Sequence, residues 1–103
     1  MKIYGIKNCD TCRKAIKALD AELHDVRDTP LAVEQLERFW QAFGQALLNT
    51  RSTTWRNLDE TARSEDPITL LQQHPTLMKR PIIERGDDLF LGWGKDVQAK
   101  LLG

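Results

Sequence analysis

Two cysteines near the start of the chain, Cys9 and Cys12, are the residues whose type and spacing could do chemistry. A Cys-x-x-Cys pair between a short apolar strand and a helix is typical of thiol–disulfide exchange. A thiol at a helix N-terminus faces unpaired backbone N–H groups and the positive end of the helix dipole, and both stabilise the thiolate. The sequence therefore predicts that Cys9 is a reactive nucleophile. Cationic residues crowd the same stretch, and they are Lys7, Arg13, Lys14 and Lys17.

The role of Cys12 has two interpretations. Its helical phase groups it with Ala15 and Ile16 on an apolar face, as expected for an inert buried cysteine. As the second thiol of a close pair, it could instead resolve a mixed disulfide on Cys9 by exchange. No metal site is expected, because a structural zinc site needs four ligands and the two histidines stand at unsuitable spacings.

Composition limits the other functions. A length of 103 residues predicts a single domain, residues 1–103, with a modest core. The balance of 15 basic and 15 acidic residues gives no global attraction to nucleic acid, and no apolar run is long enough to span a membrane. No signal-peptide core is visible, and a close cysteine pair suits a reducing compartment. We therefore expect a cytoplasmic protein that binds neither nucleic acid nor membrane directly.

The elements that must position Cys9 begin with a strand over residues 2–6 and a helix over residues 10–22. A second short strand is expected near residues 23–26, which implies a right-handed crossover and a parallel strand pair. Residues 31–75 then form a helical block. Its clearest apolar face recurs at i, i+3, i+4 and i+7, through Leu36, Phe39, Trp40 and Phe43.

Strands return after the helical block. Residues 80–84 and 89–91 flank a polar turn and predict a β-hairpin, and Val97 and Leu101 mark the apolar face of a last helix. The order β-α-β, helices, β-β-α is the thioredoxin-type arrangement. The expected fold class is therefore α/β, with a mixed four-stranded sheet and a helical insertion over residues 31–75. Only ~5% of X–Pro bonds are cis, so the composition does not predict a cis bond at Pro81.

Several stretches taken together resemble the arsenate reductase (ArsC) family, which includes Spx-type and YffB-like members. The resemblance covers essentially the whole chain and implies a thioredoxin-like fold. It implies Cys9 as the nucleophile, with Arg80 and a cis Pro81 beside it, and glutathione or glutaredoxin as the reducing partner, with no bound cofactor. The matching stretches are Tyr4–Ala15, Asn49–Asp59, His74–Glu84 and Leu91–Asp96.

The branches of this family imply different functions. In arsenate reductases three arginines hold the oxyanion; Arg80 matches one of them, but Asn49 and Gly92 stand near the other two positions. Spx-type members also bear Cys-x-x-Cys and are redox-sensing regulators that bind RNA polymerase. The opening stretch and the segment after Asn49 are most similar to the YffB-like branch of glutathione-dependent thiol reductases. We therefore expect a cysteine-dependent thiol or oxyanion reductase. An Spx-type regulator is the alternative hypothesis, and arsenate reduction proper is the third.

The candidate catalytic residues are Cys9, Cys12 and Arg80, and the substrate is expected to be a small-molecule or protein disulfide. Arg51, followed by polar residues, is expected either to form an anion-binding lip or to belong to a polar connection that caps a short helix. The remaining candidate binding residues are Lys7, Asn8 and Pro81.

Overall fold

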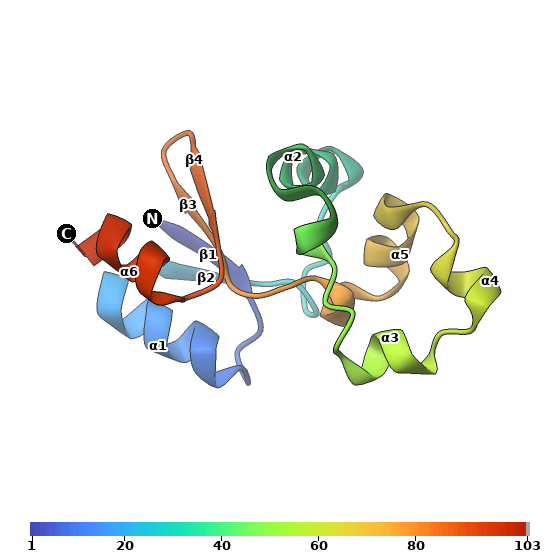
Figure 1. Ribbon diagram of the computed structural model, residues 1–103. Coiled ribbons are helices and arrows are strands. Elements are labelled where there is room, and N and C mark those ends of the chain that lie inside the picture. The colour runs from blue at the N-terminus through green and yellow to red at the C-terminus, as the bar shows by residue number, and fades with distance from the viewer. Residues whose placement is uncertain (103) are drawn as a thin grey trace. The chain divides into compact units, whose positions relative to one another are not determined.

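The computed structural model describes residues 1–102, and their contacts divide the chain into two compact units. The first unit comprises Met1–Thr29 and Arg80–Gly103, and the second comprises Pro30–Lys79 (Figure 1). The predicted helical insertion, residues 31–75, falls inside the second unit. Cys9, Cys12 and Arg80 all belong to the first.

The first unit is built on a mixed four-stranded sheet, as predicted. Its strands are β1 (Lys2–Gly5), β2 (Glu22–Asp25), β3 (Ile82–Arg85) and β4 (Asp88–Leu91), in the order β2-β1-β3-β4. β1 pairs in parallel with β2 and antiparallel with β3, and β3 pairs antiparallel with β4. The central strand β1 therefore leads directly into the loop that carries the cysteines.

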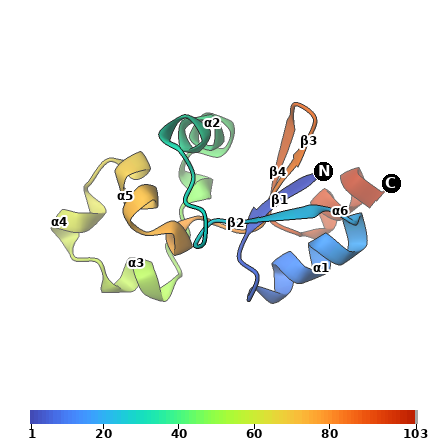
Figure 2. The same cartoon turned by 180° about the vertical axis from the view of Figure 1, so that it is seen from behind.

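Two helices, α1 (Asp10–Leu19) and α6 (Lys95–Leu102), pack on the same face of this sheet (Figure 2). α1 ends at Leu19, three residues earlier than the predicted end at residue 22. Asp20 takes a left-handed conformation with φ 50°, and its N–H caps the helix by donating to the carbonyl of Ile16. The chain needs this early stop to enter β2 at Glu22. The core of this face consists of Ile3, Ala15, Ile83 and Val97.

The second unit is helical, as predicted. α2 (Val33–Phe43) packs against α5 (Pro67–Gln73), and α2 is capped by Gly44, whose φ of 58° favours glycine. The buried apolar residues of these two helices are Leu36, Phe39, Leu70 and Leu71. The helices are α2 (Val33–Phe43), η1 (Gly44–Leu47), α3 (Thr53–Asn57), α4 (Glu60–Arg63), α5 (Pro67–Gln73) and η2 (Pro75–Leu77).

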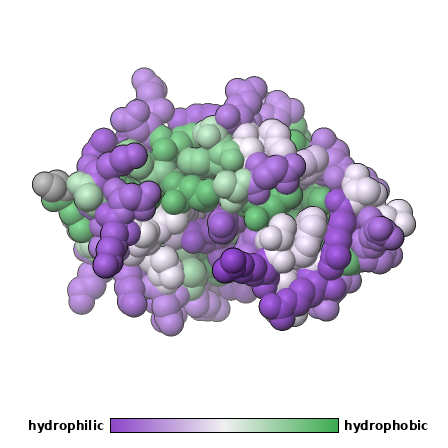
Figure 3. Space-filling model, viewed as in Figure 1, coloured by the Kyte–Doolittle hydropathy of each residue, from purple (hydrophilic) through white to green (hydrophobic). Residues whose placement is uncertain are grey.

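Side-chain caps begin three of these short helices. Ser52 Oγ accepts the N–H of Trp55 at 3.1 Å, Asp59 caps α4, and Asp66 caps α5 just before Pro67, as the Asp-Pro pair predicts. α3 and α4 contain no buried residue, and Figure 3 shows mostly hydrophilic and neutral residues over them. These two helices therefore depend on their caps more than on burial.

Gly5, at the end of β1, leaves room for a cysteine sulfur. A Cβ atom at this position would lie 2.5 Å from Cys12 Sγ, well inside van der Waals contact. The sulfur therefore packs directly against the backbone of the strand, and any side chain at position 5 would displace it.

Replacing Gly5 with alanine should lower the free energy of unfolding by about 1–3 kcal/mol, because the new methyl group overpacks the Cys12 site. Urea unfolding of the two proteins measures the loss. The same replacement in a Cys12→Ala background should cost much less, since the obstructing sulfur is gone. Equal costs in both backgrounds would contradict the contact.

Candidate active site

Cys9 is the N-cap residue of α1, at the junction of the loop and the helix. Its backbone is extended, with φ −93° and ψ 120°. Its N–H donates to the carbonyl of Ile6 at 3.1 Å, and its carbonyl accepts the N–H of Arg13 at 3.0 Å. The Cys9 side chain is half-buried, so the sulfur remains open to a reactant. This is the placement that the strand–loop–helix pattern predicts.

The pKa of Cys9 is lowered from its ordinary value by groups of its own unit. Burial is the largest single effect and would raise this pKa, because it removes water from the thiolate. Hydrogen bonds from the backbone N–H and the thiol of Cys12, and then from the Arg80 guanidinium, together outweigh burial. The thiolate, which is the reactive form of cysteine, is thereby favoured.

Cys12 has the opposite environment one helical turn later. The side chain is 0% exposed, on the α1 face that packs against Gly5. Burial, together with the neighbouring Cys9 thiol, raises the pKa of Cys12 to about 11. The Cys12 side chain is therefore buried, and its thiol keeps its proton at neutral pH.

Arg80 supplies the cation that faces Cys9. The Arg80–Pro81 peptide bond is cis, as the family resemblance implies. Pro81 itself is fully buried, and its carbonyl accepts the N–H of Gly92 at 2.8 Å. Of these two candidate residues, Arg80 therefore presents a polar side chain to the site, while Pro81 shapes the backbone beneath it.

The loop before Cys9 is tied down through Lys7. The Lys7 N–H donates to Asp25 Oδ2 at 2.9 Å, and the Lys7 carbonyl accepts from Arg13 Nε at 2.8 Å. The Lys7 ammonium forms an ion pair with Asp28 at 3.3 Å. Asn8, the other candidate binding residue of this loop, is exposed.

Asp25 was not among the residues that the sequence singled out. The available signal was an aspartate at a strand end followed by a polar stretch, which is typical of a turn closed by the carboxylate. Its Oδ1 accepts the N–H groups of Arg27 at 2.8 Å and Asp28 at 3.2 Å. The pKa of Asp25 is lowered, because these N–H groups, that of Lys7 and the charge of Arg27 outweigh the opposing effect of burial.

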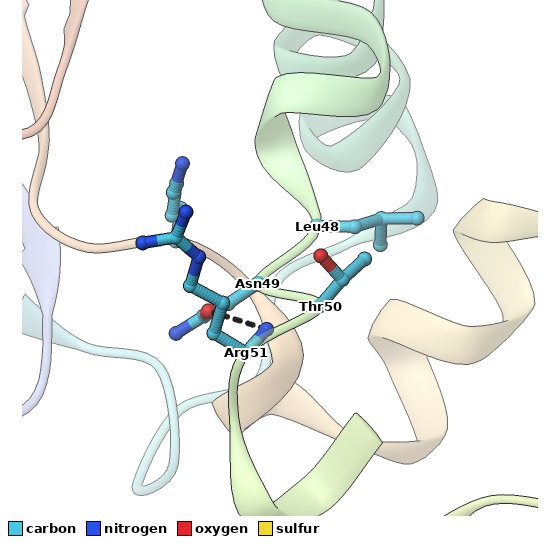
Figure 4. Close-up of a pocket in the computed structure, with 5 residues that line it drawn as sticks. Leu48, Asn49, Thr50 and Arg51 are labelled. Atoms are coloured by element: carbon cyan, nitrogen blue, oxygen red, sulfur yellow. Dashed lines mark hydrogen bonds between the residues drawn. The ribbon is translucent and has the colours of Figure 1, made fainter. Parts of the chain in front are cut away.

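Arg51 belongs to the second unit, whereas the cysteines belong to the first. Its N–H donates to Asn49 Oδ1 at 3.2 Å, and its side chain extends away from those of Leu48 and Thr50 (Figure 4). Ser52 caps α3, and the exposed residue Arg51 lines a polar cavity. The cavity measures about 400 Å³ and is lined by Leu48, Asn49, Thr50, Arg51 and Lys79.

Two of the lining residues, Asn49 and Lys79, belong to an antiparallel contact between two segments of the second unit. The Asn49 N–H donates to the Leu77 carbonyl at 2.9 Å, and the Lys79 N–H donates to the Leu47 carbonyl at 2.8 Å. These two hydrogen bonds join the backbones of the two segments. Two cationic residues, Arg51 and Lys79, line the same cavity.

Other kinds of site were sought over residues 1–102. No group of three or more His, Cys, Asp or Glu side chains in this range is arranged to hold a metal ion. Within the same range, no helix has the length and apolar character needed to cross a membrane.

A mixed four-stranded sheet with a cysteine at the N-terminus of its first helix, and a cis proline before the third strand, defines a thioredoxin-like protein. The chain belongs to the ArsC family, whose model matches residues 4–101. The resemblance proposed from the sequence is therefore confirmed.

Individual relatives agree with this assignment. The chain is 42% identical to an uncharacterized protein of Haemophilus influenzae, with 94% of this chain and 95% of the relative covered. It is 26% identical to the global transcriptional regulator Spx of Bacillus subtilis, covering 97% of this chain and 85% of Spx.

Solved structures show the same fold. The structure of the YFFB protein has a TM-score of 0.86 at 34% identity and covers 99% of this chain and 98% of its own. An arsenate reductase (ArsC) related protein from Brucella melitensis has a TM-score of 0.74 at 37% identity, covering 96% of this chain and 90% of its own.

The raised pKa of Cys12 predicts a loss of stability in alkali. The thiol ionises near pH 9.0 when unfolded but near pH 11 when folded, so between these values the folded state holds a proton that the unfolded state has lost. Stability therefore falls as the pH rises, by about 1–3 kcal/mol in total. Urea unfolding under reducing conditions at several pH values measures the fall.

Cys12→Ala is the control for this measurement. Both proteins are compared in a Cys9→Ser background, because the Cys12 thiol also lowers the pKa of Cys9, and the difference between them then isolates Cys12. Parallel stability curves for the two proteins above pH 9 would contradict the raised pKa.

Proposed function

We propose that this chain is an oxidoreductase of the thiol-reductase kind, in which the Cys9 thiolate attacks a disulfide and glutathione regenerates the free cysteine. One observation carries the proposal, which is the contrast between the two thiols. Cys9 is half-buried with a lowered pKa, whereas Cys12 is fully buried with a pKa of about 11. Membership of the ArsC family, with an arsenate reductase related protein among the structural neighbours, supports redox chemistry in general.

The first step is exchange with a small-molecule or protein disulfide. The Cys9 thiolate attacks one sulfur of the substrate, the substrate S–S bond breaks, and the other half leaves as a thiolate. Cys9 is then held in a mixed disulfide. In this proposal the Arg80 guanidinium, which stabilises the Cys9 thiolate beforehand, also holds a carboxylate of the substrate or of glutathione by charge-assisted hydrogen bonds.

The second step needs an outside thiol. Cys12 is protonated at neutral pH and packed against Gly5, so it is a poor resolving nucleophile. One glutathione thiolate attacks Cys9 Sγ and releases the bound half as a thiolate, leaving Cys9 joined to glutathione. A second glutathione, or a glutaredoxin, attacks the glutathione sulfur and releases Cys9. The sum is one disulfide reduced to two thiols and two glutathiones oxidised to their disulfide, which suits a reducing cytoplasm.

Arsenate reduction proper receives less support. Of the three arginines expected around an arsenate, the sequence supplies Arg80, while Asn49 and Gly92 stand near the other two positions. Gly92 has no side chain, so it offers the oxyanion no cation. A disulfide, whose reacting sulfur atoms carry no negative charge, needs no set of three cations and is the better substrate for these residues.

The proposal predicts different adducts on two variants. After incubation with oxidised glutathione, wild type and Cys12→Ser should each carry one glutathione, on Cys9, whereas Cys9→Ser should carry none. Intact and peptide mass spectrometry gives both the number and the position of the adducts.

The two cysteine variants are matched controls for each other, because each retains one of the two thiols. An adduct on Cys12 in the Cys9→Ser protein, or an unmodified Cys9 in Cys12→Ser, would overturn the proposed roles. Rapid conversion of the wild-type adduct to an internal Cys9–Cys12 disulfide would make Cys12 the resolving thiol in place of glutathione.

A redox-sensing regulator that binds RNA polymerase is the second candidate. The similarity to Spx over 97% of this chain, together with the Cys-x-x-Cys pair, favours it. It predicts that purified RNA polymerase binds this protein and that oxidation of the cysteines changes the affinity. Absence of binding in both redox states, measured with the purified polymerase of the source cell, would remove this candidate.

A further inference from the structure

The loop that carries Cys9 contacts a carboxylate eighteen residues away in the sequence. Asp25 is the last residue of β2 and is paired with Gly5, the last residue of β1. The Val26 N–H donates to the Gly5 carbonyl at 2.9 Å and extends the parallel ladder by one bond. Within the described residues 1–102, the pairing of β1 with β2 ends here, and the Asp25 carboxylate then accepts the Lys7 N–H at 2.9 Å.

The direction of this carboxylate is fixed from its other side. Oδ1 accepts two backbone N–H groups, those of Arg27 and Asp28, so Asp25 cannot rotate away from Lys7 without breaking them. Hydrogen bonds to a charged acceptor are roughly twice as strong as neutral ones. The carboxylate thus joins the turn after β2 to the loop after β1.

We propose that Asp25 is a positioning residue, whose carboxylate holds the Ile6–Cys9 loop so that the Cys9 sulfur stays against the Cys12 N–H and the Arg80 guanidinium. This inference rests on the proposed function in one respect, the use of Cys9 as a thiolate. The Asp25 carboxylate contacts the Cys9 loop through the Lys7 backbone N–H.

An asparagine at position 25 separates the two roles of the carboxylate. Asparagine has the same shape but only one acceptor oxygen, and its NH₂ group is a donor. If its oxygen retains the turn at Arg27 and Asp28, its NH₂ group meets the Lys7 N–H, and two donors face each other. The link to the Cys9 loop is then lost.

Asp28→Asn is a matched control. It removes the same charge, three residues away, and it also touches Lys7, but through the Lys7 ammonium at 3.3 Å and not through the backbone. The Asp28 side chain is exposed, and its bond to the Cys9 loop is to the Lys7 side chain, so its loss should leave the Cys9 sulfur in place.

Two readouts test the positioning role in the full chain. Amide hydrogen exchange, followed by NMR, reports the Lys7 N–H directly. The pH dependence of iodoacetamide alkylation, resolved by peptide mass spectrometry, reports the Cys9 pKa. Asp25→Asn should speed Lys7 exchange at least about tenfold and raise the Cys9 pKa by about one unit, which is about tenfold less thiolate at a pH below the pKa. Asp28→Asn should change neither.

Some results would overturn the positioning role. Unchanged exchange at Lys7 in Asp25→Asn would show that the carboxylate does not hold the loop. Faster exchange with an unchanged Cys9 pKa and alkylation rate, even with a lower melting temperature, would make Asp25 a purely structural residue.

The test also distinguishes this inference from the proposed function. An ordinary Cys9 pKa in wild type would end the proposed function, whereas the positioning role would still be decided by Lys7 exchange and by the Cys9 alkylation rates of the two variants. If Asp25→Asn does not fold, wild type supplies the test: the Lys7 amide shift should titrate together with the Asp25 carboxyl, and independent titration would overturn the inference.

Discussion

The first turn of α1 imposes the constraint on which the rest of the site depends. A helix begins with N–H groups that have no partner within the helix, and the residue that caps it meets those groups at the edge of the protein. Cys9 occupies that position, and Cys12, three residues later, necessarily turns toward the sheet. One helical turn thus shifts the pKa values of two identical side chains in opposite directions.

The two strands that flank β1 each position a residue that acts on the cysteine loop. The neighbour on one side, β2, ends at the aspartate that bonds the cysteine loop, and the neighbour on the other side, β3, begins just after Arg80 and Pro81. Both partners of the site therefore come from strand ends rather than from long loops. Because parallel and antiparallel pairing fix these ends in register with β1, the geometry around Cys9 is a property of the sheet.

Strands and helices, which depend on local patterns, could be predicted from the residues of the sequence. Contacts such as that of Lys7 with Asp25, which join positions far apart in the chain, could not. The strand–cysteine–helix pattern and the terminal hairpin are local, so they predicted the four strands and the place of Cys9. The end of α1 was wrong by three residues, because the left-handed Asp20 has no strong sequence signal. The link between Lys7 and Asp25 spans eighteen positions and has no periodicity, and the cavity beside Arg51 depends on two segments that meet only in the folded chain.

Because Cys12 Sγ packs closely against Gly5, labelling of the two native cysteines can measure unfolding of the first unit. In the folded chain a thiol-directed dye can reach Cys9, while Cys12 has no path to the solvent. A second dye can attach only when α1 separates from β1. The number of dyes bound per chain therefore counts opening events of the first unit, and a short labelling pulse can follow them over time with no engineered cysteine.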